Sequence, residues 1–366
     1  MRIAINARTL AYPSGGPKEY LISLVNALLA LDAGHELVLF YPDASHLGTF
    51  PGATEVVLPV ANRLAFDWLA LPLALRRSPC DVAFFPSSNM PQGIPCPAVV
   101  AMLDLGYFHP TLRMYRAADT AYMRWAIRYS ARRAERLVAI SEHTRRDVLR
   151  LTKARPERVS VTHLACDPIY HAPATPEALA AFRRARGLTR DFILYSGNVS
   201  PRKNLSTLLA AYARMADLAP CDLVITGGLA WSEDFDVMVR ETGLGDRVRR
   251  LGHVPREQMP LLYRSARALA FPSLFEGFGL PILEAQACGL PVICADATSL
   301  PEVAGRGALL VDPRSVDAWA VGLARIVSDE ALRQALAREG RANEARFTWE
   351  RTAGQTLDAL TAAVGG

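Results

Sequence analysis

Residues 271–289 read Phe-Pro-Ser-Leu-Phe-Glu-Gly-Phe-Gly-Leu-Pro-Ile-Leu-Glu-Ala-Gln-Ala-Cys-Gly. The apolar run at 268–271 is short and predicts a buried strand that ends where this stretch begins. Pro281 suits the first position of a helix, and Gly289 suits the residue just past its end. The stretch therefore predicts a strand, a glycine-rich loop and a helix, in that order, which is the repeating unit of an α/β fold.

Two carboxylates flank the Gly-Phe-Gly turn of this stretch. Glu276 lies on the expected loop, and Glu284 lies about one turn inside the expected helix. A helix start attracts negative charge, and a carboxylate can accept hydrogen bonds from a diol. A glutamate near a helix start is common on dipole grounds alone, so Glu284 by itself decides little. The pair, with free backbone amides between, predicts a site for an anionic, polyhydroxylated ligand.

The same alternation of strand and helix extends along the chain in both directions. The apolar runs are short and mostly continuous, as in a parallel sheet that is covered on both faces. With 366 residues, two domains are expected. The strands are predicted at 2–5, 36–40, 81–85, 98–102 and 136–140 in the first half, and at 192–195, 222–226, 248–251, 268–271, 291–294 and 308–311 in the second.

The fold class predicted from this pattern is α/β, with two Rossmann-like, doubly wound domains. Helices are expected near 18–31, 65–76, 120–134 and 142–151 in the first domain, and a last helix follows residue 347. We place the domains at 1–172 and 173–346, with 347–366 as a separate C-terminal helix. Ligands of open parallel sheets bind beyond the carboxyl ends of the strands, so the cleft between two facing sheets is the expected site.

Bulk composition is that of a folded protein, with 51% hydrophobic and 21% charged residues and a net charge of +5. The charge is uneven, because residues 111–158 carry thirteen Lys or Arg and five Asp or Glu. Such a basic amphipathic segment could attract an anionic lipid surface. A solvated helix face, with arginine stems covering apolar surface, explains it equally well.

The six cysteines form no Cys-x-x-Cys pair and do not cluster with histidine, so no metal site is expected. The chain opens Met-Arg-Ile-Ala-Ile-Asn, which does not resemble a signal peptide. No apolar run approaches the ~20 residues of a membrane helix. We expect a cytoplasmic protein that is at most peripheral to the inner face of a membrane.

A second strand-to-helix junction carries two adjacent cations. After the strand at 192–195 the sequence continues Ser-Gly-Asn-Val-Ser-Pro-Arg-Lys-Asn, with Gly197 early in the loop and Asn204 as the expected helix cap. Arg202 and Lys203 oppose the helix dipole there, because a helix start favours anions. Solvent exposure easily explains one such cation. The pair predicts a binding site for a diphosphate.

The first domain offers weaker candidates at two strand ends. Gly15 and Gly16 open the first helix and would let its backbone approach a ligand, although a plain turn is an equal alternative and the dinucleotide fingerprint is missing. Asp104 and His109 follow the strand at 98–102 and are its polar candidates for the cleft. A lone histidine before proline is more often structural.

Two more histidines lie at element boundaries. His253 and Val254 follow the strand at 248–251, where a nucleobase could pack against the backbone. His143 lies in a helix-cap region and is expected to do no chemistry. Because no Ser/His/Asp order, metal-ligand spacing or Walker loop is present, any reaction must rely mainly on electrostatic stabilisation of a phosphate leaving group.

With these residues in view, the chain resembles the retaining glycosyltransferases of family 4 (group 1), which have the two-domain GT-B fold. The resemblance covers nearly the whole length and is strongest from Tyr195 to Pro313. The motifs that carry it, in family order, are Gly197 with Pro-Arg-Lys-Asn204, Leu223-Val-Ile-Thr-Gly-Gly228, Leu251-Gly-His-Val, Glu276-x7-Glu284, Leu300-Pro-Glu-Val-Ala-Gly305 and Val311-Asp-Pro.

The resemblance implies a role for each domain and for particular residues. The C-terminal domain would bind a nucleotide-sugar, the N-terminal domain the acceptor, and the last helix would cross back to the first domain. Arg202 and Lys203 would hold the donor diphosphate. Glu284 would accept from the ribose hydroxyls, and Glu276 would contact the transferred sugar. The remaining implied site residues are Gly277, Phe278, Gly279, Gly15, Gly16, Gly197, His253, Val254 and Asp104.

The chemistry that the resemblance implies is hexosyl transfer with retained anomeric configuration, without metal or cofactor, to a glycan or lipid-linked glycan. The overall pattern looks like bacterial polysaccharide mannosyltransferases. Two positions depart from it: Leu103 stands where many members have His, and Asn198 where many have Arg. Alternatives are a catalytically silent nucleotide-sugar-binding module and another GT-B enzyme such as a sugar-nucleotide epimerase or a phosphorylase; no pyridoxal-binding lysine is evident for the last.

Overall fold

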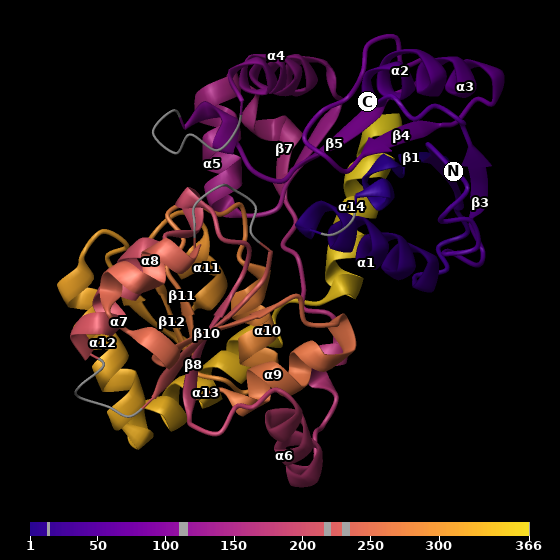
Figure 1. Ribbon diagram of the computed structural model, residues 1–366. Coiled ribbons are helices and arrows are strands. Elements are labelled where there is room, and N and C mark those ends of the chain that lie inside the picture. Colours follow the sequence, from indigo (N-terminus) through magenta and orange to yellow (C-terminus); the bar gives the residue numbers. More distant parts are fainter. Residues whose placement is uncertain (13–14, 110–115, 216–220, 229–234, 366) are drawn as a thin grey trace. The chain divides into compact units, whose positions relative to one another are not determined.

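The computed structural model describes residues 1–12, 15–109, 116–215, 221–228 and 235–365 (Figure 1). The chain divides into two compact units. Unit 1 contains the described residues up to Leu164 together with those from Thr348 on, and unit 2 contains Ala165–Phe347. The first boundary therefore lies before Ala165 and not after residue 172, because the turn and helix that follow Leu164 pack with unit 2.

Unit 1 is built on a seven-stranded sheet in the order β3-β2-β1-β4-β5-β6-β7, in which every pair is parallel. The strand order reverses between β1 and β4, which is the signature of a doubly wound sheet. The strands are β1 (Arg2–Asn6), β2 (Glu36–Tyr41), β3 (Thr54–Val57), β4 (Val82–Phe85), β5 (Ala98–Met102), β6 (Arg136–Ala139) and β7 (Val159–Val161).

The helices of unit 1 are α1 (Gly16–Ala30), α2 (Arg63–Ala65), α3 (Leu71–Arg77), α4 (Ala117–Arg133), α5 (Glu142–Thr152) and α14 (Trp349–Val364). A π-helical segment, η2 (Phe66–Ala70), joins α2 to α3. The helix expected near 65–76 is therefore one continuous helical segment with a π-helical part at its centre. Short 3₁₀ turns are η1 (Arg8–Ala11), η3 (Gly106–Phe108) and η5 (Pro156–Arg158).

Unit 2 has a six-stranded parallel sheet in the order β10-β9-β8-β11-β12-β13, whose order reverses between β8 and β11. Its strands are β8 (Phe192–Ser196), β9 (Asp222–Thr226), β10 (Val248–Gly252), β11 (Ala268–Phe271), β12 (Val292–Ala295) and β13 (Ala308–Val311). All six were predicted from the sequence, and the doubly wound α/β class is confirmed.

The helices of unit 2 are α6 (Pro176–Ala185), α7 (Leu205–Met215), α8 (Phe235–Thr242), α9 (Met259–Ser265), α10 (Leu280–Ala287), α11 (Leu300–Ala304), α12 (Val316–Ser328) and α13 (Glu330–Glu344). Its 3₁₀ turns are η6 (Pro168–His171), η7 (Pro201–Lys203), η8 (Gly245–Arg247) and η9 (Arg256–Gln258).

The central strands form the cores because most of their residues are apolar. Every residue of β4, β5, β8, β9, β11 and β12 is buried, as expected where helices cover both faces of a parallel sheet. Edge strands β3 and β7 bury their residues only in part. The apolar pattern revealed the central strands and missed these two edge strands of unit 1, whereas the edge strands β10 and β13 of unit 2, which are also only partly buried, were predicted.

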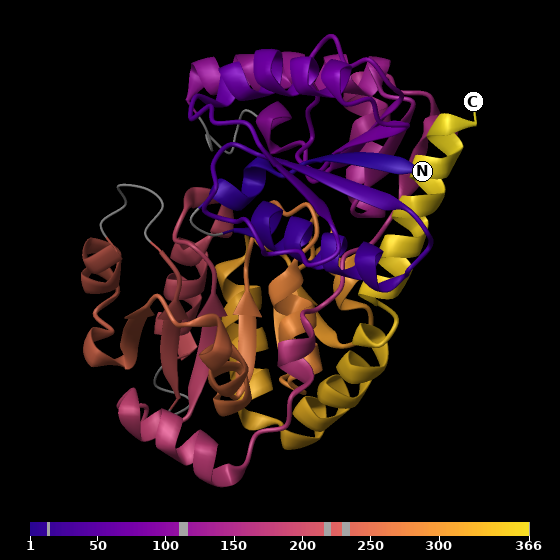
Figure 2. The same ribbon diagram turned by 90° about the vertical axis from the view of Figure 1, so that its right-hand side faces the viewer.

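The last helix belongs to unit 1, although it follows unit 2 in the sequence. Helix α14 begins after Thr348, whose hydroxyl accepts from the Arg351 amide, and it packs on α1 and on β4, β5 and β6. Its Thr352 hydroxyl donates to the His163 carbonyl at 2.6 Å. In both views α14, in yellow, runs beside the sheet of unit 1 (Figure 1 and Figure 2).

Candidate functional site

The junction of β11 with α10 has the local structure that its sequence predicts. Gly279 precedes α10 with a φ of 118°, and a Cβ added there would lie 2.8 Å from Leu300 Cδ2. Pro281 lies in the first turn, and Gly289 adopts a left-handed φ of 71° just beyond the helix end. Glycine is required at both ends because other residues would be strained there.

Glu276 lies between the two predicted phosphate-binding cations. Its carboxylate is 2.9 Å from Arg202 Nη1 and 2.6 Å from Lys203 Nζ. Arg202 also donates to the Phe275 carbonyl at 2.9 Å. Glu276 and Lys203 are nearly inaccessible, whereas the Arg202 side chain is 28% exposed. The two cations that were predicted to bind a diphosphate both pair with Glu276, and Arg202 is the more accessible of the two.

Burial and pairing act in opposite directions on these groups. Burial raises the pKa of Glu276, but Lys203 and Arg202 outweigh it and lower that pKa to about 2. Burial also lowers the pKa of Lys203, and Glu276 partly restores it. With the carboxylate ionised and both cations charged, the cluster carries one net positive charge, which a phosphate can neutralise.

The loop that carries Glu276 is fixed by residues that sequence reasoning missed. The Glu276 amide donates to the Thr298 hydroxyl at 3.1 Å. The buried Ser299 hydroxyl bonds the carbonyls of Glu276 and Phe278 at 3.0 and 2.7 Å. Thr298 and Ser299 follow β12, the strand beside β11, so their positions at the end of the neighbouring strand were the available signal.

Asn204 stands directly before α7, but it is more than the helix cap that the sequence suggested. Its backbone is left-handed, with a φ of 57°. Its side-chain amide donates to the carbonyls of Pro272 and Pro313 at 3.1 and 2.7 Å, and its oxygen accepts from the Thr207 hydroxyl. Asn204 thereby ties the turn that carries Arg202 to the end of β11.

Glu284 lies on α10 and is held by tyrosines. The Tyr263 hydroxyl donates to Glu284 at 2.6 Å, and Tyr170 also hydrogen-bonds it. Glu284 is close enough to Lys203 to raise the pKa of that ammonium. The structure thus gathers Arg202, Lys203, Glu276 and Glu284 in one region of unit 2. The tyrosines come from separate parts of the sequence, and no local pattern marks them.

The loops after β8, β9 and β10 are joined at the same edge of the sheet. Gly197 donates to the Thr226 carbonyl, and Gly227 donates to the Gly252 carbonyl, each at 3.0 Å. A Cβ on Gly227 would lie 2.2 Å from the Gly197 oxygen, so only glycine permits this approach. At Gly197 an added Cβ would lie 3.7 Å from Lys203 Nζ. The Lys203 side chain therefore lies beside the loop after β8.

The candidates for a nucleobase site follow β10. His253 is exposed and Val254 is buried, and both lie at the carboxyl edge of the sheet with the loops just described. Of the two side chains, that of His253 is accessible, whereas Val254 is 4% exposed and packs inward. A nucleobase at this edge stays a prediction.

In unit 1, the glycines at the start of α1 are open to solvent. Gly15 precedes the helix with a φ of 124°, and its carbonyl accepts from Lys18 and Glu19. A Cβ added at Gly16 would meet nothing within 4 Å. Ser14, which precedes them in the predicted motif, lies outside the described residues, as does Arg113 of the basic segment.

The other candidates of unit 1 serve local structure. Asp104 accepts from the Gly106 amide at 2.9 Å within its own turn. His109 and His143 both approach Asp147 Oδ2, at 3.4 and 3.5 Å. His143 lies in the first turn of α5, where the cap region was predicted. No local sequence pattern indicated that these two histidines share one carboxylate, because they follow different strands.

No group of three or more His, Cys, Asp or Glu side chains that could hold a metal occurs among the described residues. Within the same part of the chain, no helix is long and apolar enough to cross a membrane.

Two family models together match most of the chain. The model described as Glycosyl transferases group 1 matches residues 180–343, and the one described as Glycosyltransferase Family 4 matches residues 14–169. The O-antigen chain mannosyltransferase B of Escherichia coli is 30% identical, over 98% of this chain and 99% of its own length. The chain belongs to the group 1 glycosyltransferases of family 4.

Other relatives of this glycosyltransferase match over a smaller part of the chain or at lower identity. A D-inositol 3-phosphate glycosyltransferase of Kribbella flavida is 33% identical over a matched region that covers 63% of this chain and 57% of that protein. Among solved structures, Anabaena HepE in complex with UDP and glucose is 20% identical, with a TM-score of 0.79 and 99% of both chains covered. WaaG, a glycosyltransferase involved in lipopolysaccharide biosynthesis, is 17% identical, with a TM-score of 0.79 over 98% of this chain and 99% of its own. The predicted GT-B fold is confirmed.

Proposed function

We propose that this glycosyltransferase moves a hexose, with mannose favoured, from a nucleotide-diphosphate sugar to a glycan or lipid-linked glycan, with retention of anomeric configuration. The observation that carries the proposal is the buried Glu276 between Arg202 and Lys203, next to Glu284. The choice of mannose is supported by the similarity, over nearly the full length, to the O-antigen chain mannosyltransferase B. A nucleotide-sugar donor is supported by the similarity to the Anabaena structure with bound UDP and glucose.

In the proposed complex, unit 2 binds the donor. Arg202 and Lys203 bind the diphosphate, and the amides of residues 277–279 at the start of α10 add hydrogen bonds and a favourable dipole. Glu284 accepts from the ribose hydroxyls, in an orientation that Tyr263 fixes. Glu276 accepts from hydroxyls of the transferred sugar. The nucleobase lies against the backbone of residues 253–254 and near Gly197.

In unit 1, we propose that the amides of Gly15 and Gly16 contact the donor phosphates, and that Asp104 acts in the acceptor region. The Asp104 carboxylate also accepts from the Gly106 amide of its own turn. The basic segment of the same unit suggests a cytoplasmic enzyme that works at the inner face of a membrane.

The proposed reaction breaks the bond between the sugar anomeric carbon and the phosphate oxygen, and the acceptor oxygen bonds the same carbon from the same face. The acceptor proton leaves to the departing diphosphate. Arg202, Lys203 and the α10 amides stabilise the negative charge that develops on that leaving group, which is where fixed charges accelerate a reaction most. No metal ion is required, since these groups supply the positive charge.

The proposal is tested by a thermal-shift screen against UDP, GDP, ADP and their sugars, followed by assays of nucleotide-diphosphate release with and without acceptor. Bound ligand raises the melting temperature with the logarithm of its concentration over affinity. A transferase releases diphosphate in an acceptor-dependent way. Tight donor binding with no turnover against any acceptor would instead favour a silent binding module.

Two substitutions test the site assignment within this assay. Glu284→Ala is expected to weaken donor binding, and Lys203→Ala to reduce the turnover rate because the leaving group is less stabilised. If both variants kept the activity of the parent enzyme, the assignment of the donor site would be wrong.

A further inference from the structure

A surface of unit 1, separate from the strand-end residues above, combines exposed apolar side chains with arginines. Eight large hydrophobic residues of the described chain are exposed, and four of them, Leu64, Leu69, Leu73 and Trp125, come from the α2–α3 segment and α4. Leu69 is 71% exposed. Exposed apolar residues that gather on one surface mark an interaction site more reliably than scattered ones.

Aromatic rings join the two helical segments into one surface. Trp68 and Trp125 stack with ring centroids 5.5 Å apart, and Trp125 stacks on Tyr129 at 5.8 Å. The Trp68 indole donates to the Tyr122 hydroxyl at 3.0 Å. Leu64, Leu69 and Leu73 lie on the α2–α3 segment that this stacking joins to α4, and each is at least 45% exposed.

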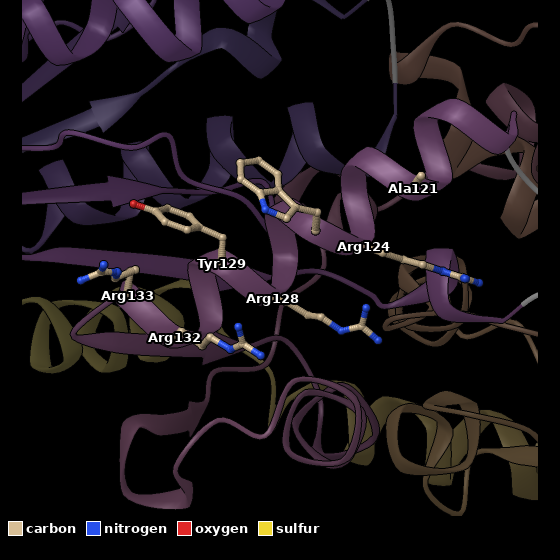
Figure 3. Close-up of a pocket in the computed structure, with 7 residues that line it drawn as sticks. Ala121, Arg124, Arg128, Tyr129, Arg132 and Arg133 are labelled. Atoms are coloured by element: carbon tan, nitrogen blue, oxygen red, sulfur yellow. The ribbon is translucent and has the colours of Figure 1, made fainter.

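The charge on this surface is strongly positive. Residues 63–77 and 117–133 contain seven arginines and two aspartates, and one of those aspartates, Asp67, is buried against Arg8. A shallow depression along α4 is lined by Ala121, Arg124, Trp125, Arg128, Tyr129, Arg132 and Arg133. Figure 3 shows the side chains of Arg124, Arg128 and Arg132 extending from this helix.

Spacing along the helix places these groups on one face. Trp125, Arg128 and Arg132 are separated by three and four residues, whereas Met123, Ala126 and Ile127 face the core. A solvated helix needs arginines but not an exposed tryptophan with three exposed leucines beside it. The combination of aromatic rings, aliphatic side chains and arginines matches the boundary between lipid headgroups and acyl chains.

We propose that this surface, formed by α2, η2, α3 and α4, docks unit 1 on an anionic phospholipid bilayer. The arginines contact the headgroup phosphates, and Leu69, Leu73 and Trp125 enter the headgroup layer. Docking would bring unit 1 to the bilayer in which a lipid-linked acceptor lies, and this part of the inference rests on the proposed function. Docking itself requires no catalytic step.

The test is co-sedimentation of the purified full chain with vesicles at 150 mM salt. Vesicles that contain phosphatidylglycerol are expected to bind the protein, and vesicles of phosphatidylcholine alone are not. Arg128→Glu with Arg132→Glu is expected to weaken partitioning about 30-fold, since each basic residue near an anionic surface contributes about 1 kcal/mol. The matched control is Arg325→Glu with Arg338→Glu, two exposed arginines of unit 2, which should bind like the parent.

An apolar substitution separates a lipid surface from a simple polyanion. Leu69→Ser is expected to reduce partitioning about tenfold, whereas Val321→Ser, with a side chain equally exposed in unit 2, leaves it unchanged. Undiminished binding of Leu69→Ser, or equal binding to neutral vesicles, overturns the proposal. If the α4 variant unfolds, Arg76→Glu with Arg77→Glu on α3 replaces it. Nucleotide-diphosphate binding measured on each variant reports on the donor site, to which none of the substituted residues is assigned, so failure of docking is distinguished from failure of the donor site.

Discussion

At the scale of single residues, the account depends on one buried carboxylate between two cations. Sequence spacing indicated that Glu276, Arg202 and Lys203 were functional, because cations at a helix start oppose the dipole. It could not show that they pair with each other, since that contact joins residues more than 70 positions apart. In the proposed mechanism, the cluster of Arg202, Lys203 and Glu276 keeps a positive charge in place before the donor binds, so little reorganisation would be needed when the phosphate leaves.

Removing the Glu276 charge should cost stability. In Glu276→Gln, Lys203 stays buried without a counter-charge, and the free energy of unfolding is expected to fall by about 3 kcal/mol. Urea denaturation measures the change. Glu339→Gln, an exposed glutamate of unit 2, is the control and should be neutral. A Glu276→Gln variant as stable as the parent would show that the ion pairs contribute nothing.

The same carboxylate predicts a pH dependence. The pKa of Glu276 is about 2 in the folded protein against 4.5 for the free group, so the unfolded state binds the proton more readily. The stability that the Glu276 carboxylate contributes is present above pH 4.5 and is lost as the pH falls toward 2. The loss is at most about 3 kcal/mol, because burial of Lys203 offsets part of the contribution. Unfolding free energies of parent and Glu276→Gln should converge over that window. A constant difference from pH 6 to pH 2 would contradict the lowered pKa.

At the scale of elements, the sequence was enough to predict the strand-to-helix junctions. It was not enough to predict the hydrogen bonds that hold those junctions in place. Pro281 and Gly289 identified the ends of α10, because proline and glycine have defined backbone preferences. The hydrogen bonds of Ser299 to the Glu276 loop, and of Tyr263 to Glu284, depend on which strands and helices become neighbours. No local sequence pattern around a serine or a tyrosine predicts that its hydroxyl will hold a loop or a carboxylate in place.

Ser299 provides a test of that support. In Ser299→Ala, the carbonyls of Glu276 and Phe278 lose their hydroxyl donor, and stability is expected to fall by about 1–3 kcal/mol, with reduced turnover as the loop shifts. Ser328→Ala also removes a serine hydroxyl bonded to a carbonyl, but at an exposed position, and should change little. Equal effects in the two variants, measured by thermal unfolding and donor turnover, would argue against a positioning role for Ser299.

At the scale of the whole molecule, two doubly wound units and a returning helix follow from the alternation of apolar runs with amphipathic segments. The first boundary was misplaced because residues 165–172 have no strong periodicity, and only their packing assigns them to unit 2. The exposed aromatic surface of α4 was also invisible in the sequence, where Trp125 reads as another apolar residue of an amphipathic helix.

In the proposed mechanism, the complete enzyme works without a metal ion. Because Arg202, Lys203 and the α10 amides supply the positive charge, EDTA is expected to leave turnover within about twofold of the untreated value. Complete loss of turnover in EDTA, restored by a divalent cation, would refute the metal-free mechanism.

The central claim is that Arg202 and Lys203 hold the donor diphosphate, and calorimetric titration with nucleoside diphosphates tests it most directly. For the diphosphate that binds the parent enzyme, Arg202→Gln should weaken affinity about tenfold or more, since a hydrogen bond to a charged group contributes about 1.5–3 kcal/mol. Arg314→Gln, an exposed arginine of the same unit, should bind like the parent. An Arg202→Gln variant that binds the diphosphate as tightly as the parent would contradict the account.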